Sequence, residues 1–220
     1  MSSGERVILI PGMGADHRLF GPQWAAGLEF EAPRFPIPDR RDTMADYAAR
    51  LRDALELSGP CVLGGVSFGG MVACELARLC QARCVLLIAS CRSGAAVPSY
   101  YRFVELASRI VPDFLIRRRC KASARLIAKL ESLTQEQFEL VGAMSRDAPV
   151  PFLRRVGRMI LNWQGPASLP CPVYHIHGDK DLIIPIRRVS PDEVVHGGGH
   201  VINLTHAEQV NRFIERCLAG

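Results

Sequence analysis

The chain lacks any long apolar run. Its first apolar stretch, residues 7–10, is followed at once by Pro11 and Gly12. A secretory signal peptide needs a longer apolar core, and a membrane-spanning helix needs about 20 apolar residues. No later stretch approaches that length. The sequence therefore predicts a soluble, cytoplasmic protein with no membrane partner.

Paired cysteine motifs, repeats and low-complexity tracts are also absent. The eight cysteines form no C-x-x-C pair and no cluster typical of a zinc site. Several lie in strongly apolar segments, where cysteine acts as a small hydrophobe. We therefore expect reduced thiols in the core, no metal and no cofactor. With 48% hydrophobic and 22% charged residues among 220, the composition is that of an ordinary globular domain.

Positive charge is in excess only in the middle of the chain. Residues 91–168 contain 13 Lys and Arg against 6 Asp and Glu, whereas the rest contains 14 against 16. Nucleic-acid binding is not expected, because no interleaved aromatic residues accompany the charge. Two explanations stay open: a solvated helix face, or a basic surface that attracts an anionic small-molecule substrate. The clustered basic residues are Arg117, Arg118, Arg119, Lys121 and Arg125, and then Arg154, Arg155 and Arg158.

Short apolar, β-branched runs alternate with helical patterns outside this middle segment. The runs are continuous rather than alternating, which is typical of strands buried on both faces of a parallel sheet. The alternation predicts an α/β fold with a small, mostly parallel, doubly wound sheet. The predicted strands are 7–10, 61–66, 84–89 and 173–176, and the predicted helices are 43–55, 70–79 and 207–218.

Residues 91–169 contain no strand-like run. Helical patterns separated by prolines and polar turns predict four helices there, at 100–110, 114–130, 135–144 and 152–163. We therefore predict an α/β core made of residues 1–90 and 170–220, with an all-helical cap, residues 91–169, inserted between two of its strands.

The strongest chemical signal is the G-x-S-x-G pattern of residues 65–69, between an apolar run and a helical pattern. A serine at such a strand-to-helix turn has a strained backbone and needs small neighbours. Its hydroxyl lies at a helix N-terminus, which favours developing negative charge. The Gly-Lys-Ser/Thr of a P-loop and the acidic residue of a dinucleotide site are both missing. The pattern predicts a nucleophile at Ser67, with a tightly packed glycine turn as the plain alternative.

A serine hydroxyl needs a base to take its proton, and His200 is the preferred candidate. It follows the glycines at 197–199, which we interpret as a loop that brings an imidazole to a defined point rather than as a packed turn. The acid must follow an earlier strand, where Asp179 and Asp181 are both available. Asp179 suits a turn cap, so Asp181 is preferred. The chain order of serine, aspartate and histidine fits a triad on an open α/β sheet.

Acyl transfer also needs hydrogen-bond donors for an oxyanion. The backbone N–H of Phe68, directly after the serine, is one candidate. The second is the N–H of Met13, in the loop of residues 11–16 after the first predicted strand. The plain alternative is that Gly12 and Gly14 only form a turn.

Together these pieces resemble the α/β-hydrolase superfamily, in the family's order and over most of the chain. The matching segments are residues 11–14, 65–69, 177–181 and 198–200. The resemblance implies a serine esterase-like hydrolase with a helical cap, which cleaves a small carboxylic ester, thioester or lactone through an acyl-enzyme. It favours Asp181, because the family's acid usually stands three residues after the glycine. The chain departs from the family pattern in two ways. Pro11 stands where many relatives have a histidine, and we expect no antiparallel edge strands before the strand at 7–10.

Other functions stay open beside this one. His175, His177 and Asp179 match an H-x-H-x-D metal pattern, but Lys180 stands where a histidine usually follows and little chain remains for further ligands. At least one of these histidines should point into the core. The same fold serves small-molecule receptors, and the same triad serves acyltransferases and carbon–carbon bond hydrolases. The sequence predicts no oligomeric state.

Overall fold

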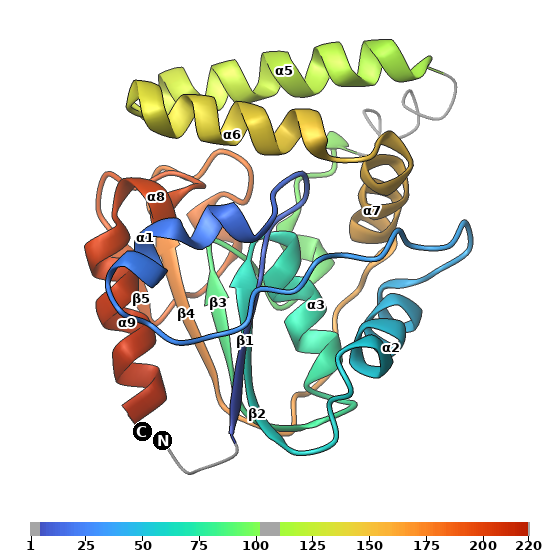
Figure 1. Ribbon diagram of the computed structural model, residues 1–220, viewed down its shortest axis with the longest axis vertical. Helices are drawn as coiled ribbons and strands as arrows, with labels where there is room; N and C mark the ends of the chain where they lie inside the picture. Colours follow the sequence, from blue (N-terminus) through green and yellow to red (C-terminus); the bar gives the residue numbers. More distant parts are fainter. Residues whose placement is uncertain (1–4, 102–110, 220) are drawn as a thin grey trace.

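A five-stranded parallel sheet forms the centre of the computed structural model, which describes residues 5–101 and 111–219 (Figure 1). The strands lie in the sheet in the order of the chain, and every neighbouring pair is parallel. The predicted α/β fold with a small parallel sheet is confirmed. The first four strands were predicted and the short fifth was not. They are β1 (Arg6–Ile10), β2 (Pro60–Val66), β3 (Gln81–Ile88), β4 (Val173–Gly178) and β5 (Glu193–Val195).

Successive strand residues point into two different cores, because side chains alternate across a strand. In β1, Ile8 and Ile10 pack with the residues of α2 and α3, whereas Val7 and Leu9 pack with those of α9. Both faces of the sheet are therefore apolar, which explains why the strands have continuous hydrophobic runs. The outcome is a three-layer arrangement with helices on either face of the sheet (Figure 1).

The helices predicted at 43–55, 70–79 and 207–218 are observed over the two faces with shifted ends, whereas two shorter helices, Gly21–Ala25 and Ile202–Thr205, were not predicted. The predicted 43–55 helix begins one residue later, after Thr43, whose hydroxyl accepts the N–H of Asp46 in a capping box. The predicted 70–79 helix begins earlier and ends earlier. The observed elements are α1 (Gly21–Ala25), α2 (Met44–Ala54), α3 (Phe68–Leu76), α8 (Ile202–Thr205) and α9 (Ala207–Ala219), with 3₁₀ turns η1 (His17–Phe20), η2 (Gly94–Ala96) and η3 (Ile186–Arg188).

The described residues between β3 and β4 form three α-helices: α5 (Asp113–Leu130), α6 (Gln135–Asp147) and α7 (Val150–Asn162). The described residues between these two strands contain no strand, as predicted. The predicted 100–110 helix lies almost entirely outside the described residues. In Figure 1, α5 and α6 lie across the carboxyl ends of the strands. We call these three the inserted helices. No helix in the described ranges combines the length and apolar character needed to cross a membrane.

The chain leaves and rejoins the core at one place. A Cβ on Gly94 would lie 1.8 Å from the carbonyl oxygen of Trp163, and one on Gly165 would lie 2.3 Å from that of Arg92. The Ser93 hydroxyl also donates to the Gln164 carbonyl at 3.0 Å. Because the two ends touch, the whole insertion can be accommodated without disturbing the pairing of β3 with β4.

The edge of the sheet at β1 is partly covered. Glu31 makes an isolated parallel bridge to Ile8, through hydrogen bonds of 2.9 Å from the Leu9 N–H and 2.8 Å to the Val7 carbonyl. This single bridge occupies backbone groups that an open edge strand would present to another chain.

Candidate active site

Ser67 occupies a strained turn between β2 and α3. Its φ of 54° and ψ of −119° lie in a region that residues other than glycine rarely adopt. The Ser67 carbonyl stabilises the turn, because it accepts hydrogen bonds from the Ser90 hydroxyl at 2.6 Å and the Gly70 N–H at 3.0 Å. A Cβ on Gly69 would lie 2.0 Å from the carbonyl oxygen of Ile10. Small neighbours are therefore required, and the partly exposed hydroxyl stands at the start of α3.

His200 lies against Ser67, 133 residues away in sequence. Its Nε2 is 2.9 Å from the Ser67 Oγ, and its Nδ1 is 2.7 Å from the Asp181 Oδ2. A carboxylate only accepts, so Nδ1–H donates to Asp181 and the unprotonated Nε2 faces the serine hydroxyl. This is the tautomer in which the imidazole can take a proton from Ser67.

The two candidate acids have different surroundings. The Asp181 carboxylate is fully buried, and its Oδ1 accepts the N–H groups of Ile183 and Ile184 at 2.7 and 2.9 Å. Asp179 is partly exposed and instead contacts His196 at 3.1 Å and the Gly197 N–H at 2.8 Å. The structure thus brings Asp181, and not Asp179, to His200.

Burial and charge compete at this pair. Burial disfavours the ionised form of Asp181, but the His200 charge and hydrogen bonds from His177, His200 and Ile184 outweigh it and hold the pKa of Asp181 well below its ordinary value. Burial likewise favours a neutral His200, yet Asp181 and Glu131 outweigh it and raise the pKa of His200. Asp181 is therefore ionised beside His200.

Two buried histidines on β4 extend this hydrogen-bonded line. The Nε2 of His177 donates to the Ile184 carbonyl at 2.8 Å and lies 3.3 Å from the Asp181 Oδ2. Its Nδ1 is 3.0 Å from the Nε2 of His175, whose pKa burial lowers to about 3. We expected at least one of these rings in the core, and both are buried. In the described residues, no cluster of three or more metal-binding side chains has the geometry of a metal site.

The two candidate oxyanion donors flank the serine. Phe68 follows Ser67 and begins α3. The loop that contains Met13 passes close to Ser67, since a Cβ on Gly12 would lie 3.6 Å from the Ser67 Cβ. Within the described residues, neither the Met13 nor the Phe68 N–H has a hydrogen-bond acceptor. Both amides are therefore available to an oxygen of a bound substrate.

Comparison with known proteins adds to this geometry. A family model described as "Alpha/beta hydrolase family" matches residues 7–213. The chain belongs to the alpha/beta hydrolase family. Similar solved structures include an esterase from Thermogutta terrifontis, with 22% identity, a TM-score of 0.70 and coverage of 98% of this chain and 90% of that one. An enol-lactonase from Burkholderia xenovorans LB400 has 16% identity, a TM-score of 0.76 and coverage of 99% and 93%.

A third similar structure is a putative non-heme bromoperoxidase from Mycobacterium tuberculosis H37Rv, with 21% identity, a TM-score of 0.67 and coverage of 99% of this chain and 92% of that one. At these identities, the three structures establish the fold of this hydrolase-family chain. The three structures share one fold but are described as an esterase, an enol-lactonase and a putative bromoperoxidase, so the fold alone does not determine the reaction.

The glycines before His200 pack more closely than predicted. A Cβ on Gly198 would lie 2.7 Å from Ile202, and one on Gly199 would lie 2.2 Å from the Glu131 carboxyl carbon. Only Gly197, with φ of 80° and nothing within 4 Å, is there for backbone conformation alone. Our interpretation of all three as non-packing residues was wrong, because sequence does not show which distant side chain approaches the loop.

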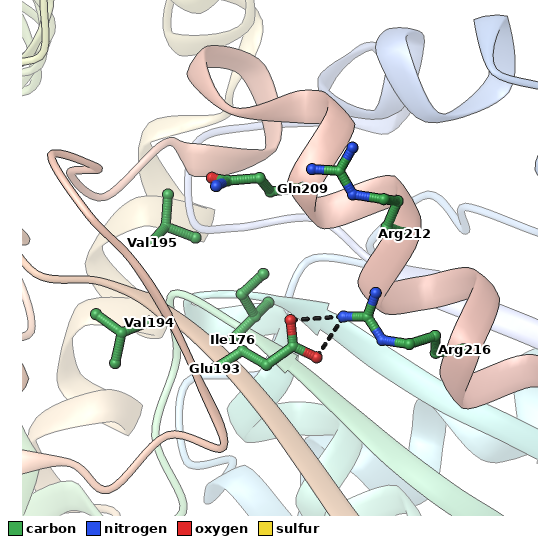
Figure 2. Close-up of a pocket in the computed structure, with 7 residues that line it drawn as sticks. All are labelled: Ile176, Glu193, Val194, Val195, Gln209, Arg212 and Arg216. Atoms are coloured by element: carbon green, nitrogen blue, oxygen red, sulfur yellow. Dashed lines mark hydrogen bonds and ion pairs between the residues drawn. The ribbon is translucent and has the colours of Figure 1, made fainter.

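A hollow of about 160 Å³, whose lining residues do not include Ser67, lies on this alpha/beta hydrolase between β5 and α9 (Figure 2). Glu193 and Arg216 form an ion pair across it, at 2.5 and 2.6 Å. None of its seven lining residues is a nucleophile or a histidine: Ile176, Glu193, Val194, Val195, Gln209, Arg212 and Arg216. This hollow therefore offers no acyl-transfer chemistry.

The two basic clusters of the inserted helices differ. On α7, Arg155 donates to the Pro38 carbonyl at 2.5 Å and Arg158 to the Asp42 carbonyl at 3.2 Å, while Arg154 pairs with Asp113 at 2.8 Å. These guanidinium groups fasten α7 to its neighbours. On α5, Arg117, Arg118 and Arg125 are exposed, and the side chains of Arg119 and Lys121 lie outside the described residues.

Proposed function

We propose that this chain is a serine hydrolase that cleaves a small carboxylic ester, thioester or lactone through an acyl-enzyme. The observation that carries the proposal is the hydrogen-bonded line from the Ser67 Oγ through His200 to Asp181, with distances of 2.9 and 2.7 Å. The strained turn supports the proposal, because a φ of 54° at a serine costs conformational energy, and such strain is typical of active sites.

Acylation begins when the Ser67 Oγ attacks the carbonyl carbon of the substrate. His200 Nε2 takes the hydroxyl proton as the carbon–oxygen bond forms, and buried Asp181 stabilises the resulting imidazolium. The oxyanion accepts hydrogen bonds from the Met13 and Phe68 N–H groups. When the tetrahedral intermediate collapses, the imidazolium returns its proton to the departing alcohol or thiol, which leaves an ester on Ser67.

Deacylation repeats these steps with water. His200 Nε2 takes a proton from the water as its oxygen attacks the acyl carbon, and the same two amides receive the oxyanion. Collapse returns a proton to the Ser67 Oγ and releases the carboxylic acid. With a lactone, alcohol and acid leave as one hydroxy acid.

The proposed substrate is a small molecule, and the basic inserted helices favour one with negative charge. On α5, Arg117, Arg118 and Arg125 are exposed and therefore act at long range, through the electrostatic potential around the molecule. Esters and a lactone are the first substrates to test, because the similar structures include esterases and an enol-lactonase.

Hydrolysis of activated esters tests the proposal. We expect turnover of p-nitrophenyl acetate, butyrate or octanoate by the wild type and none by Ser67→Ala. Ser168→Ala, at an exposed serine, is the matched control and should keep wild-type rates. Binding without turnover in the wild type would favour a receptor, and turnover independent of Ser67 would reject the proposed nucleophile. Added acceptor alcohols would reveal acyl transfer as an ester product.

A further inference from the structure

Glu131 makes a contact that sequence patterns and family resemblance do not indicate. It lies directly after α5, and its carboxylate reaches the loop of residues 197–201, which carries His200 and which we call the histidine loop. The Oε1 accepts the His200 N–H at 2.7 Å, and the Oε2 accepts the Val201 N–H at 2.9 Å. One side chain of the turn between α5 and α6 thus binds two consecutive amides at the candidate base. Hydrogen bonds to an ionised acceptor are stronger than neutral ones.

The histidine loop has the shape that this contact requires. Gly199 has no side chain, and a Cβ there would lie 2.2 Å from the Glu131 carboxyl carbon and 2.5 Å from its Cγ. On the other side, a Cβ on Gly178 would lie 2.3 Å from the Gly198 carbonyl oxygen. The loop is therefore confined between the end of β4 and Glu131. Removing either boundary gives His200 room to move.

Glu131 is itself held in place by the turn between α5 and α6. Gln137 forms a capping box with Thr134 and also donates from Nε2 to the Leu204 carbonyl at 2.9 Å. The turn therefore contacts the segment after His200 at two points, through Glu131 and through Gln137. Two attachments restrict the rotation that a single hydrogen bond would allow.

We propose that Glu131 is a positioning residue, through which the inserted helices hold His200 in line between Ser67 and Asp181. The inference rests on the proposed function, because it takes His200 as the base. Glu131 hydrogen-bonds the backbone N–H groups of His200 and Val201, so it acts through the histidine and not on the substrate. Catalytic competence then depends on the inserted helices lying in their docked position.

The Glu131 charge adds a second effect on His200. The charged groups that face the imidazole are Asp181, at 2.7 Å, and Glu131, and both favour its protonated form. The imidazolium formed in acylation is thus stabilised from two elements. Without Glu131, the pKa of His200 falls, so the neutral base persists to lower pH and the rising limb of kcat/KM moves to lower pH.

Three variants test the role of Glu131. Glu131→Gln removes the charge and keeps one acceptor, and Glu131→Ala removes both acceptors. Gly199→Ala displaces the carboxylate while keeping its charge. Because a misplacement of about 1 Å can cost about 100-fold, we expect kcat to fall by roughly 10- to 100-fold with KM changed by less than about twofold. The double variant Glu131→Ala/Gly199→Ala should be no slower than the worse single variant, since both remove one contact.

Glu136→Gln is the matched control, because Glu136 is exposed in the first turn of α6. It should leave kcat, KM and the pH profile unchanged. A purely structural role for Glu131 would lower the melting temperature without moving the pH profile, and that result would overturn the proposal. A Glu131→Gln variant with the kcat and pH dependence of the wild type would also overturn the proposal. If Glu131→Ala does not fold, the result for Glu131→Gln decides the question. Abolition of turnover by Ser67→Ala, measured in parallel, shows whether the proposed function itself holds.

Discussion

Asp181→Asn and Asp179→Asn form a matched pair of perturbations, two residues apart in one loop. In Asp181→Asn, the amide oxygen can still accept the Ile183 and Ile184 N–H groups, at the 2.7 and 2.9 Å positions of the Oδ1. The amide NH₂ then replaces the Oδ2 that stands 2.7 Å from His200 Nδ1. Two donors repel, so His200 shifts its proton to Nε2, and Ser67 faces a donor in place of its base.

The expected loss follows from that tautomer. The same change in a serine protease triad lowers kcat on the order of 10⁴-fold, which corresponds to about 5.4 kcal/mol of barrier. We expect a loss on the order of 10³ to 10⁴-fold for Asp181→Asn. The Asp179 carboxylate hydrogen-bonds His196 and Gly197 at the surface, so Asp179→Asn should keep kcat within about threefold.

The assay is steady-state hydrolysis of a p-nitrophenyl ester across pH, with circular dichroism to establish that both variants fold. Asp181 raises the pKa of His200, so residual activity of Asp181→Asn should have its rising limb at lower pH than the wild type. Equal losses in the two variants, or a larger loss at Asp179, would refute the assignment of Asp181. If the rising limb of the pH profile of Asp181→Asn stays at the wild-type pH, the claim that Asp181 raises the pKa of His200 is refuted.

Three further outcomes are expected. Gly69→Ala should prevent folding of the Ser67 turn, since its Cβ would lie 2.0 Å from a backbone oxygen, whereas Gly157→Ala, with nothing within 4 Å, should raise the unfolding free energy by about 0.5–1 kcal/mol in urea titrations. His175 takes up its proton near pH 6.5 when unfolded but only near pH 3 when folded, so stability falls as pH falls through this window. Between pH 7.5 and 5 this amounts to about 2 kcal/mol, and that part of the slope should be absent in His175→Gln. Rising salt should lower kcat/KM for an anionic ester more than for a neutral ester of similar size; identical salt profiles would leave the arginines as ordinary surface charge.

Local sequence patterns predicted the longer strands and helices of this fold. Continuous apolar runs marked β1 to β4, and helical spacing marked α2, α3 and α9, whereas the five-residue α1 was not predicted. The strand β5 was missed because Glu193–Val195 is too short to show a period. The four-residue α8 was missed for the same reason.

The candidate site divides in the same way. Ser67 and His200 stand beside glycines that are visible in the sequence, so sequence alone pointed to them, although Gly69 and Gly199 also pack against distant segments. Glu131 has no local signal, because its contact to His200 depends on how the inserted helices lie on the core, 69 residues away. His177 appeared in the sequence only within an H-x-H-x-D pattern and the 177–181 segment, and neither pattern showed that its ring would lie 3.3 Å from the Asp181 carboxylate.

Covalent labelling with a fluorophosphonate tests the central claim most directly, because the probe reacts with a serine that a neighbouring base has activated. We predict one adduct per chain, placed on Ser67 by peptide mass spectrometry, and none in Ser67→Ala, whose circular dichroism should match the wild type. Ser168→Ala should label like the wild type. Stoichiometric labelling of Ser67→Ala, or an adduct on a different residue of the wild type, would contradict the assignment of Ser67 as the nucleophile.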